Sequence, residues 1–163
     1  MTARPTSRAG TTAHDPWVPP SAFSEAGAER VDFPTLLKQS QILTLHARLT
    51  PETRGLIGKE ELARLPRGAF VVNAARGGLL DYEALFESLE RGHLSGAALD
   101  VYDPEPFPVN HPLLTHPRVV ATPHIAGATR ESALRGAEMV AEDLFRLMKG
   151  ERPRHVVNPT AIP

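Results

Sequence analysis

Short apolar segments alternate with helix-like segments from Thr35 to the end of the chain, and this alternation restricts the fold more than any other sequence feature. The apolar segments have the length and the Val, Ile, Leu and Ala content of buried strands. They are residues 42–47, 69–75, 94–102 and 119–123. The helix-like segments have apolar residues at helical spacing. They are residues 58–65, 81–92 and 129–149, with a shorter segment around Leu36 and Leu37.

Strands that are apolar on both faces and alternate with helices predict a parallel sheet covered on both sides. The predicted fold class is therefore α/β, with a doubly wound parallel sheet. Ligands of such sheets bind at the carboxyl ends of the strands, so residues that directly follow a strand are the candidates for a site. Here they are His46, residues 73–76, residues 100–105 and His124. Residues 103–118 are expected to form an extended loop because they include Pro104, Pro106, Pro108 and Pro112.

The charge balance and the absence of cysteine exclude several classes of function. The formal net charge is -1, which favours neither nucleic acid nor an anionic membrane as a partner. No apolar run approaches the roughly 18 residues that a membrane span needs. A chain without cysteine has no disulfides and no Cys-ligated zinc, and its seven histidines contain no i,i+4 pair, so no metal site is predicted. A reducing cytoplasm is the expected location.

Two side chains are candidates for holding a substrate and a proton donor. Arg76 lies between a predicted strand end and Gly77-Gly78, where a guanidinium can bind a carboxylate through two parallel hydrogen bonds. The alternative is an ordinary surface arginine at a turn. Glu105 lies between Pro104 and Pro106, which restrict the backbone and so direct the carboxylate. The alternative is an ordinary acidic residue in a loop.

His124 and Asp15 also follow predicted strands. Imidazole titrates near neutral pH, so His124 is the best candidate for a general acid or base. A carboxylate from Glu105 beside it would favour the imidazolium and fix the tautomer. Asp15 could accept hydrogen bonds from both hydroxyls of an adenosine ribose and would repel a 2′-phosphate. The alternative for Asp15 is an Asp-Pro turn.

Four motifs in order resemble the D-isomer-specific 2-hydroxyacid dehydrogenases, the family of phosphoglycerate dehydrogenase and of hydroxypyruvate and glyoxylate reductases. They are "ILTLHARLTPETRGLIG", "VVNAARGGLLD", "GAALDVYDPEP" and "TPHIAGAT". The resemblance extends from about Asp15 to Asn158. It implies a Rossmann-like NAD-binding domain over residues 15–127, followed by a helix and tail, residues 128–163, that would return to the substrate domain.

The resemblance also implies an activity and a set of site residues. The implied reaction is NAD-dependent oxidation of the CH-OH group of a 2-hydroxy acid, or reduction of the 2-oxo acid, in a homodimer if the protein is complete. The implied catalytic residues are Arg76, Glu105 and His124. The implied cofactor-binding residues are Asp15, Ala47, Ala74, Ala75, Arg76, Asp100, His124 and Gly127.

The chain departs from the family pattern at its amino-terminal side. The family has a G-x-G-x-x-G loop shortly before the position of Asp15, whereas this sequence contains no G-x-G. We therefore expect a carboxyl-terminal portion of such an enzyme, in which the first strand and the glycine-rich loop are absent and residues 1–14 are disordered or a strand remnant. The strands near Thr11–His14 and at 42–47 would each lose a neighbour. Two alternatives stay open: a truncated inactive fragment, or an NAD-binding, corepressor-like interaction protein.

Overall fold

A computed structural model describes residues 10–158 and contains two compact units, one ending at Pro123 and one beginning at His124. The elements of the first unit follow one another in an α/β order. They are β1 (Thr12–Ala13), α1 (Pro20–Glu25), β2 (Glu29–Arg30), α2 (Phe33–Gln39), β3 (Ile42–Leu45), α3 (Lys59–Arg64), β4 (Phe70–Asn73), η1 (Gly77–Leu79), α4 (Tyr82–Glu90), β5 (Gly96–Leu99), η2 (Pro112–Leu114) and β6 (Val119–Ala121). The second unit contains α5 (Arg130–Met148).

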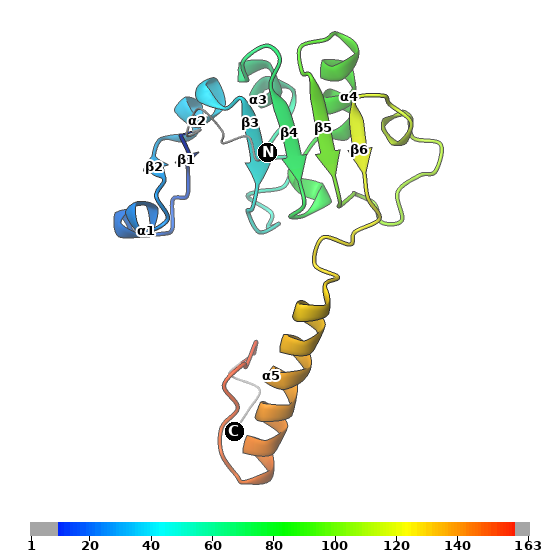
Figure 1. The fold of residues 1–163 in the computed structure, drawn as a ribbon. Helices are drawn as coiled ribbons and strands as arrows, with labels where there is room; N and C mark the ends of the chain where they lie inside the picture. Colours follow the sequence, from blue (N-terminus) through cyan, green and yellow to red (C-terminus); the bar gives the residue numbers. More distant parts are fainter. Residues whose placement is uncertain (1–9, 159–163) are drawn as a thin grey trace, which may run out of the picture. The chain divides into compact units, whose positions relative to one another are not determined.

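The strands of the first unit form two separate parallel sheets. The larger sheet has the order β3-β4-β5-β6, and the smaller one consists of β1 and β2 (Figure 1). Within residues 10–158, β1 pairs only with β2, and β3 pairs only with β4. The α/β class with a parallel sheet is therefore confirmed.

One face of the four-stranded sheet forms the main core. Leu43 of β3, Val71 of β4 and Leu99 of β5 are buried on this face. They pack in one cluster with Leu62 of α3 and Leu85 of α4, both with no exposed surface. The helices α3 and α4 therefore form a layer against this face, as Figure 1 shows behind the sheet.

On the other face of the same sheet, apolar side chains of three strands are exposed among residues 10–123. Ile42, Phe70 and Val120 alternate with the core residues along their strands and are 65%, 47% and 66% exposed. Both faces of the sheet are apolar, as the sequence predicts, but apolar character alone does not specify which segment covers a face.

Helix α4 shows how the sequence sets the ends of an element. The Asp81 carboxylate accepts a hydrogen bond from the Ala84 backbone N–H (3.0 Å) and so caps the first turn. Leu85 and Leu89 form the buried stripe. Gly92, with a φ of 64°, adopts the left-handed conformation that ends the helix. The helix predicted over 81–92 is confirmed.

The long loop after β5 contains an element that the sequence analysis missed. The one-turn helix η2 lies within residues 103–118, which were expected to be extended, and Leu113 anchors it in the core with no exposed surface. His111 and His116 in this loop contact Glu83 and Glu90 of α4, at 3.3 and 3.2 Å. The sequence analysis also missed α1 and β2. Strand β2 consists of two exposed polar residues, so it has no apolar alternation that could reveal it.

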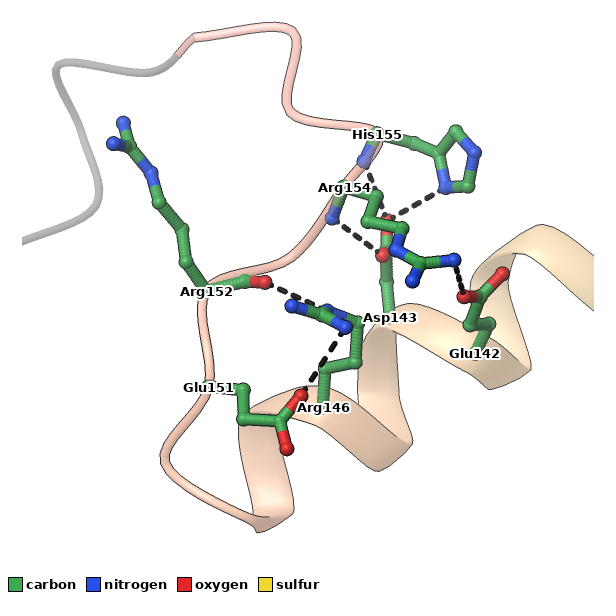
Figure 2. Close-up of polar contacts among 7 residues, drawn as sticks. All are labelled: Glu142, Asp143, Arg146, Glu151, Arg152, Arg154 and His155. Carbon is green, nitrogen blue, oxygen red and sulfur yellow. Dashed lines mark hydrogen bonds and ion pairs between the residues drawn. The ribbon is translucent and has the colours of Figure 1, made fainter.

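The second unit consists of α5 and a tail that turns back along it. Thr129 caps α5 by accepting a hydrogen bond from the Ser132 N–H (3.1 Å), and the helix predicted over 129–149 is confirmed. The tail is held mainly by the Asp143 carboxylate, which accepts hydrogen bonds from the backbone N–H groups of Arg154 (2.7 Å) and His155 (3.0 Å) (Figure 2). Among the described residues, no helix is both long and apolar enough to cross a membrane.

Candidate active site

The residues singled out from the sequence in the first unit follow strands of the two parallel sheets. Parallel strands present their carboxyl ends at one edge of a sheet, so the loops after β3, β4 and β5 are neighbours there. The loops after β4 and β5 are in direct contact, and hydrogen bonds join the segment after β5 to Thr122 after β6.

A buried amide shapes the turn that carries Arg76. Asn73, the last residue of β4, has no exposed surface. Its side-chain Nδ2 donates to the Arg76 carbonyl oxygen (3.0 Å), and its Oδ1 accepts from the Ala75 N–H (3.1 Å). Burial makes these two hydrogen bonds costly to lose, so the path of residues 73–76 is well defined. The Arg76 side chain itself is exposed, and its Nη1 donates to the Ala75 carbonyl oxygen (2.6 Å).

The turn after β4 lies directly against the loop that carries Glu105. Gly77 is buried, and a Cβ placed on it would overlap the carbonyl group of Tyr102. Only glycine permits this close backbone approach. Arg76 and Glu105 are therefore attached to two backbone segments in contact with each other.

The carboxylate of Glu105 is hydrogen-bonded to the backbone of its own loop. Its Oε1 accepts a hydrogen bond from the Tyr102 N–H at 2.9 Å. The peptide bonds before Pro104 and Pro106 are both cis. The Tyr102 hydroxyl donates to the carbonyl oxygen of Thr122 (2.9 Å), and burial, with a further contribution from the Asp100 carboxylate, raises the pKa of Tyr102 above its ordinary value. This phenol therefore remains a hydrogen-bond donor that ties the Glu105 loop to the segment after β6.

Asp100 is a buried carboxylate at the end of β5. Its Oδ1 accepts a hydrogen bond from the Thr122 hydroxyl (2.5 Å), and its backbone N–H donates to the Asn73 carbonyl oxygen (3.0 Å). The side chain is thus oriented by Thr122, a residue that the sequence analysis did not single out as part of the site.

The remaining positions implied for the cofactor lie after strands and are small or polar. Ala74 is exposed, whereas Ala47 and Ala75 are half-buried. Short side chains of this kind leave the backbone at the strand ends accessible to a ligand. Asp15 follows β1, and its Oδ1 accepts from the Trp17 N–H (2.8 Å), which is the geometry of the alternative Asp-Pro turn. Gly127 is exposed, with no atom near its missing Cβ.

His124 lies shortly after β6 and is the first residue of the second unit. Its backbone φ is 56°. Among the described residues, His124 is the only one other than glycine with a positive φ. Such a conformation is unfavourable for a residue with a Cβ, and it is enriched at functional sites. Convergence of His124 with Arg76 and Glu105 remains a prediction.

The sequence analysis assigned no role to three residues that orient the candidates, although two of them lie within the candidate ranges 73–76 and 100–105. Asn73, Tyr102 and Thr122 act through hydrogen bonds to the candidate residues or their loops. All three lie inside the quoted motifs, but the sequence did not show which groups their side chains would contact. Arg54 also lies inside a motif, but its pairing with Asp103 had no sequence signal, because the two residues are far apart in the sequence.

Comparison with known proteins identifies the domain to which this site belongs. The sequence model described as "D-isomer specific 2-hydroxyacid dehydrogenase, NAD binding domain" matches residues 6–126. The chain is 45% identical over 150 residues to a D-3-phosphoglycerate dehydrogenase of Archaeoglobus fulgidus, covering 92% of this chain and 28% of the relative. It is 46% identical over 130 residues to a glyoxylate reductase of Thermofilum pendens, covering 80% of this chain and 38% of that enzyme.

A solved structure shows the same fold. The D-lactate dehydrogenase of Lactobacillus jensenii, crystallised with NAD+, is 34% identical and superimposes with a TM-score of 0.85 over 91% of this chain and 48% of that enzyme. The chain thus spans less than half the length of these three relatives. Because the relatives are dehydrogenases and a reductase, neither the inactive-fragment nor the corepressor interpretation is favoured.

Proposed function

Because the chain belongs to the D-isomer specific 2-hydroxyacid dehydrogenase family, whose NAD-binding domain it matches over most of its length, we propose that it provides the cofactor-binding and catalytic part of an NAD-dependent oxidoreductase. The reaction would interconvert a small 2-hydroxy acid and the corresponding 2-oxo acid. The observation that supports this most directly is the contact between the Arg76 turn, at Gly77, and the Glu105 loop, at Tyr102.

Each proposed catalytic group has a distinct task. The Arg76 guanidinium would bind the substrate carboxylate through two hydrogen bonds and polarise the adjacent C2 carbonyl. As C2 of the 2-oxo acid is reduced, its oxygen would take a proton from the His124 imidazolium, and in the reverse direction neutral His124 would remove that proton. Glu105 would stabilise the imidazolium and fix the tautomer of the neutral imidazole.

The residues at the strand ends fit parts of the proposed cofactor site. NAD would supply the hydride acceptor, and NADH the hydride donor. Asp15 would accept from the adenosine ribose, and Asp100, held by Thr122, would face the carboxamide end. No G-x-G occurs in the sequence to form a glycine-rich turn for the pyrophosphate. We therefore expect NAD binding by this chain alone to be weak, and low-micromolar affinity for NADH in isothermal titration would contradict that expectation.

Substrate recognition can be tested without the cofactor. We expect glyoxylate, titrated into the ¹⁵N-labelled chain, to shift the NMR signals of the Arg76 side chain and of Gly77 and Gly78. The variant Arg76→Gln should lose this response. The matched control is Arg91→Gln, since Arg91 is an exposed arginine at the end of α4. Equal glyoxylate affinity in Arg76→Gln and the unaltered chain would refute the assignment of Arg76.

The redox role of His124 needs a separate measurement. At high NADH concentration, we expect glyoxylate or hydroxypyruvate to cause a slow loss of NADH absorbance, and His124→Ala should abolish it. An active chain whose turnover is unchanged by His124→Ala would remove His124 from the mechanism.

We also propose a cytoplasmic homodimer, on the basis of the cysteine-free sequence and the family resemblance.

A further inference from the structure

An ion pair joins the loop after β3 to the loop after β5. Arg54 Nη1 lies 2.5 Å from Asp103 Oδ2, and the two residues are 49 positions apart in the sequence. The side chains are 61% and 41% exposed. Exposed ion pairs add little to the stability of a fold, so a contribution to stability alone does not account for the specific placement of this pair.

The turn after β4 packs against the same ion pair. A Cβ placed on Gly78 would lie 3.0 Å from Arg54 Nη1 and 3.0 Å from Asp103 Oδ2. In addition, the Gly55 N–H donates to the Gly78 carbonyl oxygen (2.8 Å). The loops after three adjacent strands therefore meet at this pair.

The ion pair contacts or belongs to the two backbone segments that carry the proposed catalytic side chains of the first unit. Asp103 follows Tyr102, whose N–H donates to the Glu105 carboxylate. Gly78 follows Gly77, which contacts Tyr102 and is preceded by Arg76. A shift of Asp103 would therefore move the backbone that directs Glu105 and the surface against which the Arg76 turn rests.

We propose that Arg54 and Asp103 are positioning residues that hold the Arg76 turn and the Glu105 loop at a fixed separation. The proposal rests on the proposed function, because it assigns the pair a role through Arg76 and Glu105. It adds two residues whose part in the reaction is indirect: neither is expected to touch the substrate.

The first experiment measures the position of the loops and does not depend on catalysis. Hydrogen exchange is measured at the Tyr102 and Gly55 amides in the unaltered chain, Arg54→Gln, Asp103→Asn and the double variant. We expect protection to fall about two- to fivefold in each single variant, with no further fall in the double variant. Arg54→Lys should restore part of the protection, because lysine retains the charge but lacks the planar fork.

The matched control is another exposed ion pair, one that joins helices α3 and α4 instead of two of the three loops. Lys59 Nζ lies 3.0 Å from Glu87 Oε2, with side chains 65% and 50% exposed. We expect Lys59→Gln to leave the Tyr102 and Gly55 amides unchanged. If Arg54→Gln also leaves them unchanged, or if Lys59→Gln affects them equally, the positioning role is wrong.

The second experiment connects the pair to substrate binding. Arg54→Gln and Asp103→Asn should weaken glyoxylate binding about two- to fivefold with almost unchanged thermal midpoints, whereas Lys59→Gln should not weaken it. Unaltered glyoxylate affinity together with lost amide protection would show a purely structural link and overturn the proposal. Failure of the unaltered chain to bind glyoxylate would instead count against the proposed function, while the exchange data would still decide whether the pair holds the loops.

Discussion

Helices α4 and α5 have the same amphipathic sequence pattern but differ in the burial of their apolar residues. In α4, Leu85 and Leu89 have no exposed surface. In α5, which is twice as long, no residue is buried, and Leu134 and Leu144 are 54% and 56% exposed. Apolar residues at helical spacing therefore predict that a helix forms and which of its sides is apolar, but not whether another part of the same unit covers that side.

The two helices are consequently held by different forces. The stripe of α4 packs into the core cluster, so its stability comes from removing apolar surface from water. The contacts of α5 with its tail are mainly hydrogen bonds and ion pairs, centred on Asp143, Arg146 and Arg154 (Figure 2). Burial of apolar surface changes little with pH or salt, whereas polar contacts respond to both.

The largest effect is expected for Leu85→Ala in α4. Truncating a fully buried leucine removes apolar contacts and leaves a cavity, so the free energy of unfolding should fall by about 2–5 kcal/mol. Urea denaturation followed by circular dichroism would measure the change. A loss below about 1 kcal/mol would show that the α4 stripe is much less important than its burial indicates.

The next effect concerns Asp143 and the pH. Hydrogen bonds from the Arg154 and His155 backbone N–H groups lower the pKa of Asp143 below its ordinary value of 3.8. A lowered folded-state pKa means that the carboxylate stabilises the docked tail above pH 3.8, and that this contribution is lost as the pH falls through the lowered pKa. The amide signals of Arg154 and His155 should therefore change in strong acid. In Asp143→Asn they should show no such transition, and a transition of the same size in that variant would contradict the assignment.

A smaller effect is expected for the ion pair at the end of the tail. Arg154 Nη1 lies 2.6 Å from Glu142 Oε1, and the two side chains are 62% and 44% exposed. Arg154→Gln should weaken tail docking by about 0.2–1 kcal/mol, and high salt should reproduce most of that loss in the unaltered chain. Hydrogen exchange of the His155 amide at low and high salt would test this, with Arg91→Gln as a control that leaves the tail unaffected.

The smallest effect is expected for Leu144→Ala, the same substitution as in α4 but on α5. An exposed leucine loses few contacts on truncation, and alanine favours a helix, so the unfolding free energy should change by less than about 0.5 kcal/mol. A loss as large as that of Leu85→Ala would show that the apolar side of α5 is covered in solution.

Most elements were predictable because their residues determine them locally. The segments 81–92 and 129–149 carry their own capping residues, Asp81 and Thr129, and both helices formed as predicted. Strands were predicted one or more residues too long at one or both ends. The predicted strand at 94–102 is only Gly96–Leu99 in the structure, because its ladder with β4 ends at Asn73 and Leu99. Strand ends depend on the partner strand, which the local sequence does not specify.

The location of the candidate site could be predicted from the sequence, but the side-chain contacts that hold its loops in place could not. Parallel topology requires strand-end residues such as Arg76 and Asp100 to lie at one edge of the sheet. The buried amide of Asn73 and the Arg54–Asp103 ion pair could not be predicted, because each depends on the path of loops in three dimensions.

The sequence by itself determined the α/β class, the helix caps and the set of candidate side chains, since periodicity and capping reflect interactions between residues close together in the chain. Only the tertiary structure decided which face of the sheet is covered, how the strands divide into two sheets, and which distant residues hold the loops around Arg76 and Glu105. These features depend on contacts between segments far apart in the chain, and such contacts are determined by how the whole unit packs.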